Sequence, residues 1–189
     1  MSDQDFIKKY LDDFSALVKP EQEIVNKIVE IKNILNETKK NNAKTLIFGN
    51  GGSAAIASHF AVDLSKNGKV RTLCFNEPSL ITCLSNDYGY ENWVSKCIEY
   101  HADEGDSVIL ISSSGKSKNM LNGASATREK MVHKLITFSG FEENNPLSNV
   151  GDINVWVNSK AYNFVENIHQ IQLLAIVDSI IGTEFYDAS

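Results

Sequence analysis

Two short loops in this sequence carry residue types that suit the binding of an anion. The run Gly49-Asn50-Gly51-Gly52-Ser53 lies between an apolar segment and an alanine-rich one, an order typical of a strand, a tight turn and a helix. Glycine lets the backbone approach a ligand closely, and a following helix offers free N–H groups and a partial positive charge. The loop therefore favours a phosphate or a sugar oxygen, although a tight connection without a ligand would use the same residues.

The second loop is rich in hydroxyl groups. In the run Ser112-Ser113-Ser114-Gly115-Lys116-Ser117, four serines surround one glycine directly after an apolar segment. Hydroxyl donors and helix-terminal N–H groups can satisfy the acceptor oxygens of a phosphate monoester without a cation. The alternative is that serine only caps the next helix. We expect the four serines of this loop to hold a phosphate group.

Both loops belong to an alternation of strands and helices. Apolar runs predict strands over residues 45–48, 70–75, 107–111, 134–139 and 153–157. Helical spacing of apolar residues predicts helices over residues 54–64, 78–86, 92–101, 119–130 and 162–181. This order predicts an α/β fold in which a parallel sheet has helices on both faces.

Residues 1–40 carry apolar side chains at helical spacing, with an interruption near Pro20. Two amphipathic helices are predicted there, and their apolar stripe would cover either the chain's own sheet or a neighbouring subunit. We expect residues 1–40 to lie at an oligomer interface. Residues 1–189 together have the length of a single domain.

The composition excludes several classes of partner. With a net charge of −6, the chain lacks the excess of Lys and Arg that binding to nucleic acid or to an anionic membrane requires. We expect no membrane span, because no apolar run of the sequence approaches the roughly 18 residues that a span requires. The three cysteines lack C-x-x-C spacing, and the first residues do not show the basic stretch followed by an apolar segment that is typical of a secretory leader. We expect a cytoplasmic protein without an organic cofactor.

Four blocks of the sequence together resemble a known family. They are Phe48-Gly49-Asn50-Gly51-Gly52-Ser53-Ala54-Ala55, His59-Phe60-Ala61, Ser85-Asn86-Asp87-Tyr88-Gly89-Tyr90 and Ile111-Ser112-Ser113-Ser114-Gly115-Lys116-Ser117. In this order they closely resemble bacterial phosphoheptose isomerases of the sugar isomerase (SIS) superfamily, over almost the whole chain. The resemblance implies a three-layer αβα sandwich around a five-stranded parallel sheet, usually assembled as a homotetramer. It also implies an aldose–ketose isomerase that interconverts sedoheptulose 7-phosphate and D-glycero-D-manno-heptose 7-phosphate.

The resemblance assigns roles to residues of both loops. Ser112, Ser113, Ser114 and Ser117 would hold the phosphate. The sugar would be contacted by the glycine-rich turn and one acidic residue, namely by Asn50, Gly51, Gly52, Ser53 and Asp87.

The resemblance also points to acid–base and metal-binding positions, where this chain departs from the family pattern. The family has a histidine and a glutamate four residues apart, and this chain has His59 and Asp63 on one helix face. On the terminal helix, Glu166 stands at a glutamine position and Leu174 at a histidine position. Leucine can neither transfer a proton nor bind a metal.

The chemistry of these positions leaves alternatives open. Asp63 or Glu166 would be the base that moves a proton through an enediol. Alternatively, His59, Asp63 and Glu166 would hold zinc or another divalent metal with an open coordination position, or they would form a merely structural polar cluster. Because Leu174 replaces a catalytic group, the competing function is a non-catalytic sugar-phosphate-binding protein that acts as a sensor or an interaction module.

Overall fold

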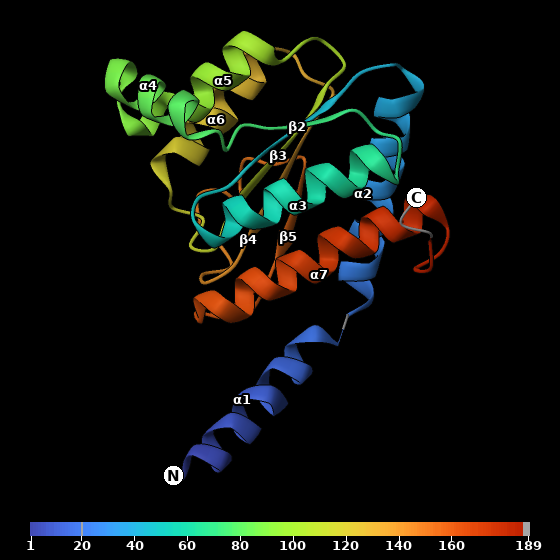
Figure 1. Cartoon of the computed structure of the whole chain (residues 1–189), viewed down its shortest axis with the longest axis vertical. Helices are drawn as coiled ribbons and strands as arrows, with labels where there is room; N and C mark the ends of the chain where they lie inside the picture. The colour runs from blue at the N-terminus through green and yellow to red at the C-terminus, as the bar shows by residue number, and fades with distance from the viewer. Residues whose placement is uncertain (20, 187–189) are drawn as a thin grey trace.

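The computed structural model describes residues 1–19 and 21–186, in which helices and strands alternate (Figure 1). The helices are α1 (Asp3–Val18), α2 (Gln22–Lys40), α3 (Gly52–Lys66), α4 (Pro78–Tyr88), α5 (Trp93–His101), α6 (Lys118–Glu129) and α7 (Tyr162–Ile181), with a 3-10 helix η1 (Tyr90–Asn92). The strands are β1 (Thr45–Phe48), β2 (Thr72–Cys74), β3 (Ser107–Ser112), β4 (Lys134–Ser139) and β5 (Ile153–Trp156). Every predicted element is present, and the bounds differ from the predictions by a few residues at most.

In the described part of the chain, the five strands form one parallel sheet with the order β2-β1-β3-β4-β5. Side chains of β3 alternate between its faces: Ile109 and Ile111 pack with α2, α3 and α7, whereas Val108 and Leu110 pack with α5 and α6. Burial on both faces explains why this strand is a continuous apolar run in the sequence. The predicted α/β three-layer sandwich is confirmed.

Helix α1 projects away from the sandwich (Figure 1). None of its residues is buried, and Phe6, Ile7 and Leu11 are each more than half exposed, at 55%, 57% and 58%. Apolar side chains gathered on one exposed helix usually mark a surface that contacts another molecule. The predicted break near Pro20 falls on a residue outside the described ones.

Helix α7 has the length and composition of a helix that could cross a membrane, which corrects the expectation that the chain holds no such segment. Its packing identifies it as a core helix. Leu173, Ile176 and Val177 lie in the apolar cluster that α7 shares with α2 and α3.

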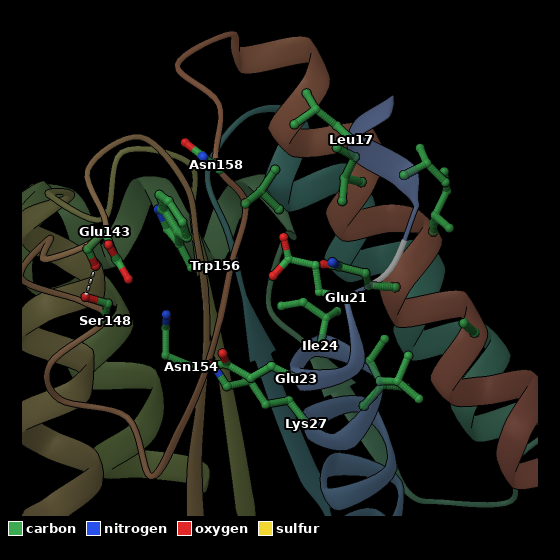
Figure 2. Close-up of a pocket in the computed structure, with 18 of the residues that line it drawn as sticks. Leu17, Glu21, Glu23, Ile24, Lys27, Glu143, Ser148, Asn154, Trp156 and Asn158 are labelled. Atoms are coloured by element: carbon green, nitrogen blue, oxygen red, sulfur yellow. Dashed lines mark hydrogen bonds and ion pairs between the residues drawn. The ribbon is translucent and has the colours of Figure 1, made fainter. Parts of the chain in front are cut away.

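A groove of about 870 Å³ lies along the β5 edge of the sheet, where α1 ends and α2 begins (Figure 2). One side of α7 and the segment before β5 complete its walls, and Trp156 and Asn154 of β5 lie between these walls. The residues that line this groove include none from the loops at 49–53 and 112–117. The groove is therefore a surface separate from the predicted sugar-phosphate site.

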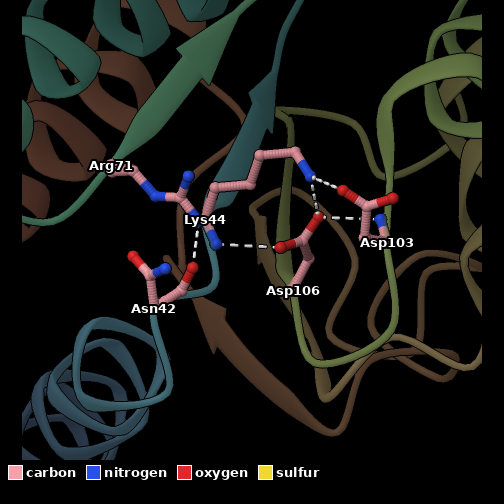
Figure 3. Close-up of polar contacts among 5 residues, drawn as sticks. All are labelled: Asn42, Lys44, Arg71, Asp103 and Asp106. Carbon is pink, nitrogen blue, oxygen red and sulfur yellow. Dashed lines mark hydrogen bonds and ion pairs between the residues drawn. The ribbon is translucent and has the colours of Figure 1, made fainter.

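A buried carboxylate joins β1 to β3 at the amino ends of these strands (Figure 3). Asp106, which is 1% exposed, accepts hydrogen bonds at 2.8 Å from the backbone N–H groups of Lys44 and Asp103. The Nζ atom of Lys44 lies 2.5 Å from Asp106 and 2.6 Å from Asp103. Nearby, Arg71 donates to the carbonyl of Asn42. This network lies at the edge of the sheet opposite to the carboxyl ends of the strands, where the motif loops begin.

Candidate functional site

The glycine loop (residues 49–53) and the serine loop (residues 112–117) lie side by side. The glycine loop follows β1 and the serine loop follows β3, and these neighbouring parallel strands end at the same edge of the sheet. A pair of hydrogen bonds joins Asn50 in the glycine loop to Asn119 in the first turn of α6. The Nδ2 of Asn50 donates to Oδ1 of Asn119 at 3.0 Å, and Nδ2 of Asn119 donates to Oδ1 of Asn50 at 2.8 Å.

The glycine loop has the backbone geometry that its sequence predicted. Gly51 has φ = +55°, in a region that favours glycine, and it caps the N-terminus of α3. A Cβ on Gly49 would lie 2.4 Å from the carbonyl group of Ser53, so the turn leaves no space for a side chain. The side chain of Ser53 is buried at the start of α3. The backbone of the loop thus meets a helix N-terminus, where an anionic group is favoured.

The hydroxyl groups of the serine loop are arranged as donors. The Oγ atoms of Ser112 and Ser117 lie 3.0 Å apart, so one hydroxyl donates to the other. The Oγ of Ser114 accepts from the backbone N–H of Lys116 at 3.2 Å, which leaves the hydroxyl hydrogen of Ser114 for a ligand. Ser113 is buried, and its carbonyl accepts from the N–H of Gly140 at 3.0 Å.

Gly115 allows the segment after β4 to pack closely against the serine loop. It has φ = +64°, and a Cβ there would lie 1.8 Å from Oδ1 of Asn145. The carbonyl of Gly115 accepts from the N–H of Leu147 at 3.1 Å, and its N–H donates to the carbonyl of Ser112 at 2.9 Å. The loop is therefore held in one conformation by the segment that follows β4.

Glu166 of α7 reaches the start of α3. A Cβ on Gly52 would lie 2.2 Å from Oε2 of Glu166, which shows that the carboxylate occupies the space directly beside this glycine. Glu166 is half-buried, and its burial raises the pKa of its carboxyl. A carboxyl with a raised pKa beside a ligand loop has the properties of a general acid or base.

His59 and Asp63 contact each other on α3, as their spacing predicted. The Nε2 of His59 lies 3.1 Å from Oδ2 of Asp63, and Nδ1 of His59 lies 3.0 Å from Nε2 of Gln170 on α7. Because the Gln170 amide nitrogen can only donate, Nδ1 of His59 accepts, and the ring proton lies on Nε2 toward Asp63. Both nitrogens of His59 are therefore engaged with neighbouring side chains.

The predicted three-ligand metal site is not assembled within one chain. Among residues 1–19 and 21–186, no group of three or more His, Cys, Asp or Glu side chains is placed to hold a metal ion. Glu166 lies beside the first residue of α3, whereas His59 and Asp63 lie two and three turns further along that helix. The donor set of His59, Asp63 and Glu166 thus does not fit a metal here, and Leu174 is a half-buried residue without a donor atom.

The last turn of α4 and the η1 helix after it contribute one expected residue and one unexpected one. Asp87 is exposed, and its carboxylate accepts from Nδ2 of Asn86 at 2.9 Å. The hydroxyl of Tyr90 donates to Oδ1 of Asn50 at 2.9 Å, so η1 contacts the glycine loop. Sequence reasoning assigned no role to Tyr90 or Asn119, although both lie within or just after the motif blocks.

The chain is similar in sequence to known proteins of one family. A family model described as the SIS domain matches residues 6–140. The phosphoheptose isomerase of Trichlorobacter lovleyi is 40% identical over 133 residues, which cover 67% of this chain and 68% of that protein. The phosphoheptose isomerase of Helicobacter hepaticus is 34% identical over 181 residues, which cover 91% of each chain.

The fold also matches that of a solved structure. The structure of a phosphoheptose isomerase from Neisseria gonorrhoeae superposes with a TM-score of 0.88, covering 95% of this chain and 99% of that chain. The two sequences are 24% identical over this match, so the superposition shows a common fold.

Proposed function

This chain belongs to the SIS domain family, and from that membership we propose that it is a phosphosugar aldose–ketose isomerase of the phosphoheptose isomerase type. Its substrate pair is sedoheptulose 7-phosphate and D-glycero-D-manno-heptose 7-phosphate. The observation that carries the proposal is that Glu166, a half-buried carboxylate, lies against the glycine loop. Asn50 of this loop is hydrogen-bonded to Asn119 of α6, the helix that follows the serine loop. A phosphate-binding loop beside a candidate base is what such an isomerase needs.

The serine loop would bind the phosphate and thereby position the sugar. Hydroxyl groups of Ser112, Ser114 and Ser117, together with the backbone at Ser113, would satisfy the phosphate oxygens. The sugar chain would then extend across the glycine loop, toward Asn50 and Ser53 and the backbone of Gly51 and Gly52. Asp87, exposed at the end of α4, would contact a sugar hydroxyl.

Glu166 would transfer the proton between the two reacting carbons. Its carboxylate would take the proton from the hydroxyl-bearing carbon beside the carbonyl group, which gives an enediolate. The proton of that hydroxyl would pass to the former carbonyl oxygen, and Glu166 would return its own proton to the former carbonyl carbon. The raised pKa of Glu166 makes the carboxylate a stronger base than an exposed glutamate. Asp63 is the second candidate base, and its partner His59 orients its carboxylate.

One observation favours the competing function of a sugar-phosphate sensor. Leu174 stands at the position where the family resemblance implies a histidine, and the described residues of one chain hold no cluster of metal ligands. Such a protein would bind the phosphosugar without turning it over. Turnover therefore separates the two functions.

The quaternary state belongs to the same proposal. The exposed apolar stripe of α1 and the groove at the β5 edge supply adjacent surfaces for other subunits, and a homotetramer is the state that the resemblance implies. A cytoplasmic location is supported by the three cysteines, Cys74, Cys83 and Cys97, which are free.

NMR spectroscopy of turnover tests the function directly. The protein is incubated with sedoheptulose 7-phosphate and with other ketose phosphates, in separate samples with zinc, with another divalent metal or with a chelator. We expect a new aldose signal from sedoheptulose 7-phosphate, and we expect Ser114→Ala and Ser117→Ala each to weaken its binding by about 1 to 3 kcal/mol. Binding without turnover under all metal conditions would replace the isomerase by the sensor.

A further inference from the structure

The amide of Asn50 is held in one orientation by its neighbours. An amide oxygen has two acceptor positions, and both positions of Asn50 Oδ1 are filled by Nδ2 of Asn119 at 2.8 Å and the hydroxyl of Tyr90 at 2.9 Å. The Nδ2 of Asn50 has two hydrogens, and one of them is donated to Oδ1 of Asn119 at 3.0 Å. Asn50 is therefore left with a single N–H donor and no free acceptor.

The direction of these hydrogen bonds is set by the backbone. The N–H of Met120 donates to Oδ1 of Asn119 at 3.2 Å, while it also donates to the carbonyl of Ser117 at 3.0 Å. A backbone N–H cannot accept a hydrogen bond. If the amide of Asn119 were flipped, its NH₂ group would point at the N–H of Met120, and two donors would meet. Because Asn119 is 2% exposed, no water replaces the lost partner at low cost, and its orientation dictates that of Asn50.

We propose that Tyr90 and Asn119 are positioning residues that convert Asn50 into a donor-only group for the sugar. This inference deepens the proposed function and relies on it for the identity of the ligand. Asn119 directs the amide of Asn50, and Tyr90 occupies its remaining lone pair, so a substrate hydroxyl cannot donate there. The free N–H then reads a substrate oxygen that accepts, such as a carbonyl oxygen or the enediol oxygen that gains negative charge.

The position of Tyr90 supports a role in the sugar part of the site. It is 53% exposed and lies on η1, whereas its hydroxyl reaches into the glycine loop. The serine loop has no hydrogen bond with Tyr90 among the contacts of the described residues. Loss of the Tyr90 hydroxyl should therefore affect recognition of the sugar and leave the binding of phosphate unchanged.

A double-mutant cycle between Tyr90 and Asn50 tests the proposal. Calorimetry measures the affinity of the full chain for sedoheptulose 7-phosphate and for inorganic phosphate in four proteins: the unmodified protein, Tyr90→Phe, Asn50→Ala and the double variant. We expect Tyr90→Phe to bind the sugar phosphate about three- to tenfold more weakly, the loss of one neutral hydrogen bond, with unchanged affinity for inorganic phosphate. In the Asn50→Ala background, Tyr90→Phe should have no further effect.

Tyr100→Phe is the matched control, because the hydroxyl of Tyr100 contacts only the exposed hydroxyl of Tyr88, at 3.2 Å, in the contacts of the described residues. The proposal is overturned if Tyr90→Phe behaves like this control, if it weakens phosphate binding equally, or if its effect persists without the Asn50 side chain. The binding measurement tests the positioning role of Tyr90 and Asn119, and the turnover measurement tests the isomerase function. If the protein binds the sugar phosphate without turning it over, the isomerase function is wrong and the positioning role still holds.

Discussion

The carboxylate of Glu166 on α7 lies so close to Gly52 on α3 that a Cβ on the glycine would come within 2.2 Å of Oε2. Gly52 has no left-handed backbone angle, so alanine can adopt its conformation and would even favour the helix. A side chain at this position therefore conflicts with the Glu166 carboxylate and not with the turn, so the carboxylate would have to shift.

Replacing Gly52 by alanine should displace the Glu166 carboxylate and lower turnover. We expect kcat to fall by roughly ten- to hundredfold, since a displacement of about 1 Å in a catalytic group has effects of this size. Steady-state kinetics measure the change, and thermal unfolding should show a stable fold. In a Glu166→Ala background the Gly52→Ala substitution should cost nothing more, and a further loss there would contradict this explanation.

The raised pKa of Glu166 predicts the pH dependence of turnover. Burial raises this pKa above its ordinary value of 4.5, and a base must be ionised, so kcat/KM should fall as the pH drops through the raised pKa. The acid limb of the profile should therefore lie above pH 4.5, and Glu166→Gln should abolish it while lowering turnover by about 10²- to 10⁴-fold. An unchanged profile in Glu166→Gln would assign the base to another group.

The same raised pKa also affects the stability of the fold. The free energy of unfolding should decrease a little as the pH rises through this pKa, because the native state favours the protonated form of Glu166.

The buried ring of His169 on α7 predicts that the protein loses stability in acid. Its Nε2–H donates to the carbonyl of Ser139 at 3.1 Å, and burial lowers its pKa from 6.5 to about 4. The unfolded chain therefore binds the proton first, so the contribution to stability is complete above pH 6.5 and is lost as the pH falls toward 4. The free energy of unfolding should decrease by up to about 3 kcal/mol across this interval. Urea unfolding measures it, and His169→Gln, which keeps an N–H donor without titrating, should show a flatter dependence.

The Lys44–Asp106 contact predicts a large effect on stability without an effect on the site. Asp106→Ala would leave the backbone N–H groups of Lys44 and Asp103 without their acceptor and would remove the buried partner of the Lys44 ammonium group, which would keep only its contact with the exposed Asp103, at a cost of about 3 to 5 kcal/mol. Denaturant unfolding measures this cost, and Asp103→Ala is the control because its exposed carboxylate contributes much less. Phosphate affinity of the folded Asp106→Ala protein should be unchanged, since the network lies at the opposite edge of the sheet.

The exposed stripe of α1 predicts an assembly that depends on apolar contacts. Ile7→Glu and Leu11→Glu should shift the protein toward smaller species, because each would place a charge in the buried surface of an oligomer. Light scattering at micromolar concentration measures the mass. Lys8→Glu changes a charge on the same helix at a polar residue and should leave the mass unchanged. A monomer in the unmodified protein would contradict the predicted tetramer.

Much of the fold was predictable because each element is specified locally. The strands at residues 45–48 and 134–139 were predicted with their observed bounds, since burial on both faces concentrates apolar residues in a short segment. The contact between His59 and Asp63 was also predictable, because two residues four positions apart in a helix lie on one face whatever surrounds them. The adjacency of the two loops followed from the rule that parallel strands end at the same edge of the sheet.

The site depended on contacts that no local pattern specifies. The two hydrogen bonds of Asn50 with Asn119 span 69 positions, and the one with Tyr90 spans 40. They exist only because α6 and η1 pack beside the glycine loop. The crossing of α3 and α7 likewise placed Glu166 beside Gly52, so Glu166 did not join His59 and Asp63 as a third metal ligand. Sequence spacing determines which residues share a helix face, but the relative position of two helices is decided by how all their buried side chains pack together.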